Sequence, residues 1–351
     1  MKMTKMVMSA AVMAVSVVGC GGQSSSVEAP VSLGSASSEL SLPNGNWLFG
    51  SDTLKQALIT ANTISFSGLV IQGKGSGVGE GCTRATGATY KDAAGNTVTA
   101  CAGRQQTIAP MSRDFKAPCE AGESSNIVAL DAVNAFVSAA NGVTNISKAN
   151  LTKVFFSNTG ACISDWSALG RATGGTIVKY RRDDVSGTTD TFKSLLGGTT
   201  FCSDVVVVSD NDTAKGCSGL SATDCIEKLT ANDNNAIGYS GDSAKTPAGT
   251  TPANLALSVD GIASTATNVR KLLSGDPTVY PLSRFIFVNE NVNYAKDSKE
   301  QKLYDWMYNN KASFENILVG QGFIACDPSI PLGCGGDLND GRGAGACYQP
   351  F

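Results

Sequence analysis

The sequence contains no histidine among its 351 residues, and this absence excludes a large block of chemistry. Histidine is the usual general base of nucleophilic triads and the commonest protein ligand of metals near neutral pH. Ser-His-Asp hydrolases, Cys-His proteases, HExxH zinc enzymes and haem proteins with a histidine ligand are therefore excluded. An enzyme built on this chain has only carboxylates, lysine, tyrosine or a Ser-Lys pair for proton transfer and nucleophilic attack.

Charged residues are also scarce, at 16% of the chain, with 27 Lys plus Arg against 30 Asp plus Glu. The formal net charge of -3 provides no basic field for nucleic acid, so we expect no nucleic-acid partner. The 42% of hydrophobic residues is enough for the core of one large or two ordinary domains. With so few charges, we expect Gly, Ser, Thr and Asn to cover most of the surface.

The N-terminal apolar run, Met6 to Val18, is too short for an ordinary membrane-spanning helix. Lysines precede it, as in an export signal. It leads into Val17-Val18-Gly19-Cys20, which resembles the bacterial lipobox, where the cysteine thiol is lipidated before cleavage. We expect residues 1–19 to be a lipoprotein signal peptide and Cys20 to carry the lipid. A plain secretory signal with an incidental cysteine is the alternative.

Residues 20–45 are rich in Ser, Gly and Ala and have almost no periodic apolar pattern, as is typical of a flexible tether. We expect this tether to join the lipid anchor to a folded body, so that the membrane is contacted through the anchor only. The expected location is the cell envelope, as a periplasmic or outer-membrane lipoprotein in an oxidising compartment. Which membrane holds the anchor is left open.

The 11 cysteines suit an exported, oxidised protein. Once Cys20 is set aside ten remain, enough for five disulfides. None of them forms a CxxC pair, so we expect disulfides and no metal site. Nearest-neighbour pairing predicts Cys82 with Cys101 and Cys326 with Cys334, and spacing leaves the connectivity open. The ten are Cys82, Cys101, Cys119, Cys162, Cys202, Cys217, Cys225, Cys326, Cys334 and Cys347.

Short apolar strands alternate with helical stretches from residue 46 onward. Predicted strands are Trp47 to Phe49, Leu69 to Ile71, Ile127 to Val137, Ile177 to Tyr180 and Tyr280 to Val288. Helical spacing of apolar residues follows several of them, whereas Cys202 to Gly249 has a loop-like composition. Strand then helix, repeated, predicts an α/β fold with a mostly parallel sheet.

Three junctions place a small hydroxyl residue where a helix is expected to begin. They are Ser51-Asp52-Thr53, Ser76-Gly77 and Ser186-Gly187-Thr188. A helix N-terminus carries unpaired N–H groups and the positive end of the helix dipole, so it attracts anions. An ordinary N-cap explains any one of them alone, whereas three in one chain favour an oxyanion site. The glycine-rich stretch Gly73 to Gly79 matches neither GxGxxG nor a P-loop, so nucleotide binding is not indicated.

The third junction is preceded by Arg182, whose guanidinium offers a planar fork of donors to an oxyanion. Asp184 stands two residues further on and is predicted to lie beside that fork and hold it in place. A surface ion pair of little energetic value is the alternative for the two residues.

Several stretches between Ile127 and Trp306 resemble the phosphate-binding proteins of bacterial phosphate ABC transporters, the PstS-like group. Order and rough spacing agree from about Leu48 to Ile324, and the resemblance is strongest from 127 to 192. The matching stretches are Ile127 to Val137, Leu151 to Ser157, Ile163 to Gly170, Arg182 to Phe192, Ile237 to Tyr239, Tyr280 to Phe285 and Leu303 to Trp306.

The resemblance implies an α/β fold of the type II periplasmic binding proteins, in which two hinge strands join two lobes that clamp the ligand. Lobe I is expected over 46–124 and 280–351, and lobe II over 125–279. A monomer that captures inorganic phosphate and delivers it to permease subunits of an ABC transporter is implied, with no catalytic residue and no cofactor.

The same resemblance implies which residues bind phosphate. They are Thr53, Leu54, Ser76, Gly77, Ser112, Arg113, Arg182, Asp184, Ser186, Gly187 and Thr188. In this scheme Asp184 braces the guanidinium of Arg182, while Thr53 offers its hydroxyl and Leu54 a backbone N–H. Ser51 and Asp52 differ from the small apolar residues of the family.

Arg113 stands where the best-known members have an aspartate that accepts the proton of hydrogen phosphate. Such a carboxylate rejects sulfate, which has no proton to give at neutral pH. Arginine in place of aspartate adds a cation and removes the proton acceptor, so the choice among tetrahedral oxyanions, sulfate included, is left open. Without histidine, we expect the pH dependence of binding near neutrality to follow the second ionisation of phosphate itself.

Two other functions remain as alternatives. One is an enzyme that uses Ser76 or Ser186 as a nucleophile on a phosphate ester, although spacing positions no lysine to activate either serine. The other is a surface or adhesion protein that keeps the binding-protein scaffold without a transport role, since fold does not determine function.

Overall fold

The computed structural model describes residues 46–91, 96–101, 105–116, 118, 120–184 and 186–334. The predicted signal peptide, the tether and the lipidation site Cys20 lie outside these residues, and so do Cys119 and Cys347. Within the described ranges no helix has the length and apolar character needed to cross a membrane. The predicted lobe boundaries stay a prediction.

A mixed eight-stranded sheet organises the chain, with the order β10-β9-β11-β7-β14-β5 and short strands β12 and β6 beside it. Its longest strands are β7 (Ile127–Ser138) and β14 (Ser283–Asn291), which pair antiparallel. Every residue of β7 is buried, because β7 lies between β11 and β14 and is covered on both faces. The apolar run predicted from residue 127 onward is this strand.

The elements that surround one end of β14 come from both ends of the chain. They are β1 (Trp47–Gly50), α1 (Asp52–Ser65), β2 (Val70–Gly73), α2 (Ser76–Thr83), β3 (Ala88–Lys91), β4 (Thr97–Ala100), β5 (Ile108–Met111), β6 (Glu123–Ser124), α7 (Ser298–Asn309) and α8 (Lys311–Gly320). Helix α1 buries Leu54, Ala57, Leu58 and Ala61, the helical spacing that makes one face apolar. That face packs with Leu303 and residues of α8 in a core shared with β1, β5 and β14.

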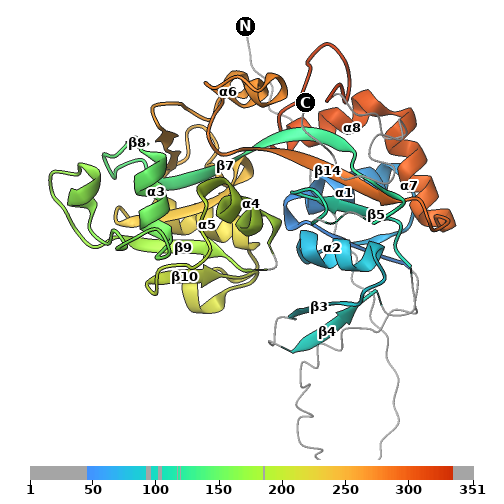
Figure 1. Ribbon diagram of the computed structural model, residues 1–351, viewed down its shortest axis with the longest axis horizontal. Coiled ribbons are helices and arrows are strands. Elements are labelled where there is room, and N and C mark those ends of the chain that lie inside the picture. The colour runs from blue at the N-terminus through green and yellow to red at the C-terminus, as the bar shows by residue number, and fades with distance from the viewer. Residues whose placement is uncertain are drawn as a thin grey trace, which may run out of the picture. The chain divides into compact units, whose positions relative to one another are not determined.

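The middle of the chain builds the elements around β9 and β11. They are β8 (Asn145–Ile146), α3 (Lys148–Phe155), β9 (Val178–Arg182), α4 (Gly187–Leu196), β10 (Val205–Val208), α5 (Ala222–Asn232), β11 (Ala236–Gly241), β12 (Asn254–Ala256), β13 (Ser258–Val259) and α6 (Ala266–Arg270), with 3-10 turns η1 (Trp166–Leu169), η2 (Thr213–Lys215), η3 (Asp242–Ala244) and η4 (Lys271–Ser274). The rings of Phe192 and Tyr239 stack at 3.9 Å in the core of this region. In Figure 1, β7 and β14 pass from these elements to α1, α2 and α7.

Two expectations about this fold were wrong. The sheet is mixed rather than mostly parallel, because β7 runs antiparallel to both of its long neighbours, β11 and β14. The stretch from Cys202 to Gly249 is not a set of loops, since it contains β10, α5 and β11. Its polar composition hides a narrow apolar stripe on α5, at Cys225 and Ile226, and a capping box between Ser221 and Asp224 begins that helix.

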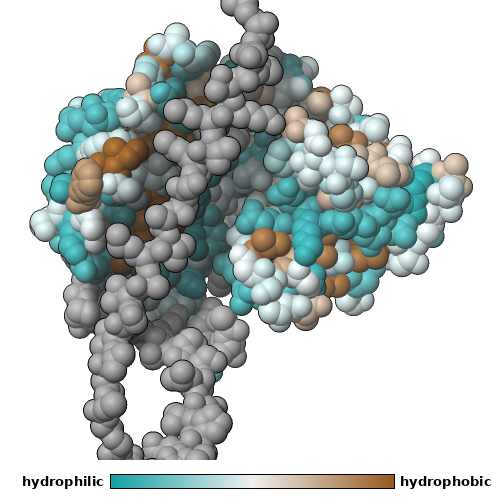
Figure 2. All heavy atoms as spheres, turned by 180° about the vertical axis from the view of Figure 1, so that it is seen from behind, coloured by the Kyte–Doolittle hydropathy of each residue, from teal (hydrophilic) through white to brown (hydrophobic). Residues whose placement is uncertain are grey.

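Disulfides join Cys82 to Cys101 and Cys326 to Cys334, which confirms the two predicted pairs. Two further disulfides join Cys162 to Cys202 and Cys217 to Cys225. In the part of the chain that is described, no group of acidic or cysteine side chains could hold a metal ion. On the face that Figure 2 shows, the coloured part is mostly hydrophilic or pale, intermediate residues, with hydrophobic patches among them.

Candidate functional site

Three helices begin at the same place. Thr53 is the second residue of α1 and Thr188 the second residue of α4, and their Oγ1 atoms lie 3.2 Å apart. A Cβ atom added at Gly187, the first residue of α4, would overlap the hydroxyl oxygen of Ser76, the first residue of α2. The structure therefore brings together the three junctions identified in the sequence. The N-terminal ends of α1, α2 and α4, which carry the positive ends of the helix dipoles, therefore lie close together.

The local sequence explains why these helices begin where they do. Ser51 and Ser186 are N-caps, and each side-chain oxygen accepts the N–H two residues later at 3.2 Å, from Thr53 and Thr188 respectively. Gly75, the N-cap of α2, has φ of 97°, a conformation that favours glycine. Two of the three predicted junctions therefore also serve as ordinary N-caps, and the hydroxyl of Ser186 is used in this way.

Ser76 and Ser112 form a second pair of hydroxyls beside Gly187. The backbone N–H of Ser112, which follows β5, donates to Ser76 Oγ at 3.0 Å, and the two Oγ atoms lie 3.2 Å apart. Both side chains are fully buried. Because a Cβ at Gly187 would overlap both oxygens, only glycine allows α4 to approach this closely.

Arg182 ends β9 and is 2% exposed. Its Nη1 donates to Thr223 Oγ1 at 2.8 Å, and its Nη2 lies 3.3 Å from Asp52 Oδ2. Its Nε is buried and has no hydrogen-bond partner among the described residues. A buried guanidinium N–H without an acceptor is costly, and an anion at this place would remove that cost.

Asp52, the first residue of α1, gives the site a carboxylate. Burial raises its pKa from the ordinary value to about 6, against the lowering effect of Arg182, while Asp210 and Asp183 raise it further. Asp52 and Thr53 line a cavity of about 670 Å³, together with Thr223, Asp210, Asp242 and other polar residues. The start of α1 and Thr223, the hydroxyl that Arg182 contacts, therefore border an open, polar cavity.

Asp184 does not brace Arg182, contrary to the expectation from the sequence. Its two carboxylate oxygens accept from Arg181, each at 3.0 Å, and Lys193 Nζ lies 2.9 Å from it on an exposed surface. Strand alternation points Arg181 and Arg182 to opposite faces, and Asp184 lies on the face of Arg181. The carboxylate beside Arg182 is Asp52.

Arg113 is committed to protein acceptors at all three guanidinium nitrogens. Nε donates to Asp190 Oδ2 at 3.0 Å, Nη2 to Glu80 Oε2 at 2.6 Å and Nη1 to the carbonyl of Asp114 at 2.7 Å. The contacts with Glu80 on α2 and Asp190 on α4 join these two helices. These contacts use three of its five N–H donors, and their geometry is that of an ion-pair link; a ligand role for Arg113 stays a prediction.

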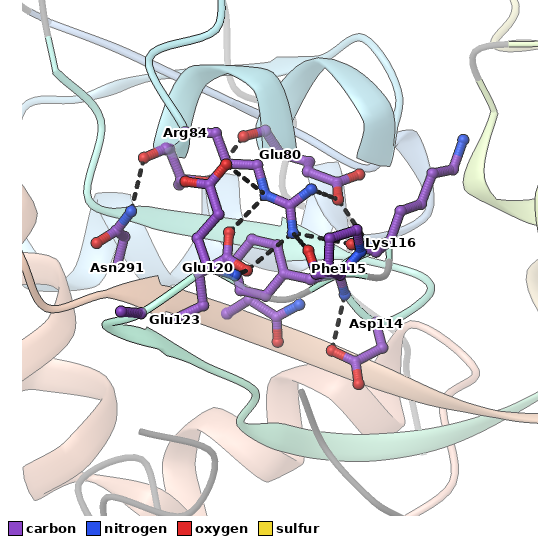
Figure 3. A network of polar contacts seen from close by, with 12 residues as sticks. Glu80, Arg84, Asp114, Phe115, Lys116, Glu120, Glu123 and Asn291 are labelled. Atoms are coloured by element: carbon purple, nitrogen blue, oxygen red, sulfur yellow. Dashed lines mark hydrogen bonds and ion pairs between the residues drawn. The ribbon is translucent and has the colours of Figure 1, made fainter. Parts of the chain in front are cut away.

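Glu80 belongs to a larger charge network on the far side of Arg113. Arg84, the C-cap of α2, lies 3.0 Å from Glu80 and forms two hydrogen bonds with the buried carboxylate of Glu123. The backbone N–H of Lys116 donates to Glu80 as well. Figure 3 shows Arg84 between Glu80 and the acidic residues of the 120–123 segment. This network fixes the orientation of the carboxylate that holds Arg113.

The remaining predicted residues contribute through the backbone. Leu54 is fully buried in the core, so only its N–H, the third of α1, is near the site. Gly77 is the second residue of α2, and a Cβ there would lie 3.7 Å from Arg113 Nη2. The sequence reasoning missed three residues. It named Asp52 only as part of a junction. Thr223, which contacts Arg182, and Arg284, whose Nη1 donates to Thr188 Oγ1 at 3.0 Å, had no local signal.

The fold matches that of type II periplasmic binding-protein structures. Solved structures of phosphate-binding proteins of ABC transport share this fold. A Clostridium perfringens substrate-binding protein with bound phosphate is 19% identical over 80% of this chain and 99% of its own, with a TM-score of 0.57. An ABC-type phosphate transport receptor from Vibrio cholerae is 19% identical over the same shares, with a TM-score of 0.56.

A phosphate-binding protein from Stenotrophomonas maltophilia is 11% identical over 80% of this chain and 90% of its own, with a TM-score of 0.56. At these identities the likeness is one of fold. No protein-family model matches the sequence, and no curated protein matches it.

Proposed function

We propose that this protein binds inorganic phosphate for uptake by an ABC transporter. The observation that carries the proposal is the buried Nε of Arg182, which has no partner among the described residues. The same guanidinium contacts the first residue of α1, and the next residue of α1 contacts the start of α4. Arginine forks, hydroxyls and helix N-termini are the donors that bind tetrahedral oxyanions. The fold shared with phosphate-binding proteins supports the same ligand.

The carboxylate of Asp52 favours phosphate over sulfate in this proposal. An ionised carboxylate within reach of a bound anion repels it unless a proton lies between them. Hydrogen phosphate brings such a proton and sulfate does not. In this proposal Asp52 accepts the proton of hydrogen phosphate, the role that an aspartate at the position of Arg113 has in the best-known members of the family.

The remaining parts of the proposal concern the setting of the protein. Four disulfides in the described residues support an oxidising compartment outside the cytoplasm. We further propose that the protein is lipidated at Cys20, acts as a monomer and delivers phosphate to permease subunits. We assign no enzymatic role, because the hydroxyls of Ser76 and Ser186 bond to Ser112 and Thr188 rather than to a general base.

Isothermal titration calorimetry of the protein, produced with its disulfides intact and freed of bound anion, tests the proposal. We expect phosphate and arsenate to bind and sulfate to bind at least about 100-fold more weakly at neutral pH. Arg182→Met should abolish phosphate binding, whereas Arg181→Met, the neighbouring arginine that pairs with Asp184, should preserve it. The absence of heat with all three anions would overturn the proposal and favour the scaffold protein without a transport role.

A further inference from the structure

Arg284 forms a buried ion pair between the two long central strands. It lies on β14 directly opposite Asp131 on β7. Its Nε and Nη2 donate to Asp131 Oδ2 at 2.9 Å and 2.5 Å, and the two residues are 4% and 1% exposed. The second oxygen, Asp131 Oδ1, accepts hydrogen bonds from two backbone N–H groups, that of Ala132 at 2.8 Å and that of Asp242 at 3.3 Å. The carboxylate is fully bonded, so the guanidinium has one fixed orientation.

The third nitrogen of Arg284 reaches the anion site. Its Nη1 donates to Thr188 Oγ1 at 3.0 Å. A guanidinium has donors and no acceptor, so the hydroxyl oxygen of Thr188 must accept this bond. The proton of Thr188 is then free to point elsewhere. The neighbour within reach is Thr53 Oγ1, at 3.2 Å, on the side where the helices α1 and α4 begin.

We propose that Arg284 is a positioning residue that holds the hydroxyl of Thr188 as a hydrogen-bond donor to the bound anion. The inference rests on the proposed function of this site. A hydroxyl can donate or accept, and an oxyanion only accepts, so a hydroxyl that is already an acceptor from Arg284 meets the anion with its proton. The positive charge of Arg284 is offset by Asp131, and its contribution is therefore one of direction rather than of net charge.

The surroundings of the ion pair restrict the conformations available to the side chain of Arg284. A Cβ at Gly241, which ends β11, would lie 3.0 Å from Asp131 Oδ2 and 3.2 Å from Arg284 Nη2. The backbone of β11 therefore closes over the pair. An arginine held in this way has a preorganised donor and loses little side-chain entropy when the anion binds.

A double-mutant cycle with phosphate binding as the readout tests the inference. Arg284→Lys keeps a charge opposite Asp131 but does not provide the fork that reaches Asp131 and Thr188 together. We expect it to weaken phosphate binding about 10-fold, since one hydrogen bond to a charged ligand is misdirected. Thr188→Val should weaken binding at least as much, and adding Arg284→Lys to Thr188→Val should cause no further loss. Thr188→Ser keeps the hydroxyl and should remain sensitive to Arg284→Lys.

A paired variant separates this role from one in stability alone. Asp131→Leu with Arg284→Met removes both buried charges together, so no unpaired charge remains in the core. It should fold, as thermal unfolding would verify, and bind phosphate about 10-fold more weakly. If the unchanged protein binds no phosphate, the proposed function fails. If it binds phosphate and Arg284→Lys has no effect, or weakens binding equally with and without Thr188→Val, only the positioning role fails.

Discussion

The guanidinium of Arg182 lies 3.3 Å from the carboxylate of Asp52, although the two residues are separated by 130 positions in the chain. The contact joins the end of β9 to the start of α1 and adds a negative charge to a group of anion-binding donors. Burial raises the pKa of that carboxyl to about 6, so its charge changes within an accessible pH range. Ligand choice and the pH dependence of sulfate binding are both expected to follow from this pair, whereas the absence of histidine had predicted that only phosphate itself titrates near neutrality.

Asp52→Asn should relax selectivity. The amide has nearly the same shape as the carboxylate but does not repel sulfate, so sulfate affinity should rise about 10-fold or more relative to phosphate affinity. Competition calorimetry at about pH 7.5 measures the ratio of the two affinities. Asp184→Asn is the matched control, because Asp184 pairs with Arg181 on the exposed surface and should leave the ratio unchanged.

Sulfate binding should also depend on pH through Asp52. The pKa of this group is raised to about 6, so the neutral carboxyl is the main form below that pH and the carboxylate above it. Sulfate does not titrate in this range, so a rise in its affinity as pH falls from about 7 to about 5 reports the protein group. The rise should be absent in Asp52→Asn. A flat profile in the unchanged protein would contradict the role of Asp52.

Asp242 should lower stability at neutral pH. Burial and the nearby charge of Asp131 raise its pKa to about 6, while Asn134 Nδ2 donates to it at 2.8 Å. The folded state binds the proton more tightly than the unfolded state, so the free energy of unfolding falls as pH rises through the range between the two pKa values. Asp242→Asn should be more stable by up to about 3 kcal/mol at neutral pH, with the difference gone below about pH 3. Urea unfolding across this pH range measures it.

The disulfides should differ in their contribution to stability. The bond between Cys162 and Cys202 spans 40 positions and the one between Cys217 and Cys225 spans 8. Closing the longer loop removes more entropy from the unfolded chain, about 4 kcal/mol against about 2.5 kcal/mol. Replacing both members of each pair with alanine, followed by chemical denaturation, should rank the two variants in this order. Equal losses would show that chain entropy is not the main contribution.

Arg113→Asp should destabilise the protein rather than create a new specificity. The variant places a carboxylate between Glu80 and Asp190. In the unchanged protein Arg113, whose side chain is 11% exposed, neutralises the charges of these two residues. We expect a loss of about 3–5 kcal/mol in the free energy of unfolding, as for a broken buried ion pair. Lys116→Asp, an exposed neighbour 3.4 Å from Asp190, is the control and should cost under about 1 kcal/mol. A stable Arg113→Asp variant with altered anion choice would contradict the ion-pair role.

The features that could be predicted from the sequence depend on neighbours along the chain. The long apolar run from residue 127 is β7, and the serines at 51 and 186 cap helices, because backbone conformation and capping are decided within a few residues. That the threonines at the starts of α1 and α4 bind an anion was implied by the family resemblance, and it stays a prediction. Two disulfides were predicted by pairing nearest neighbours in the chain, whereas the bond between Cys217 and Cys225, with the same separation of 8 as one of them, was not.

What only the tertiary structure decided is which distant side chains meet. Asp184 was chosen as the partner of Arg182 by its closeness in sequence, but the alternation of β9 turns the two to different faces and α1 supplies Asp52 instead. The contact of Arg113 with Asp190 and that of Arg284 with Thr188 also join residues that are far apart in the sequence. Charge and hydrogen bonding act over a few ångströms of space, so their partners depend on how strands and helices pack, which a local pattern does not contain.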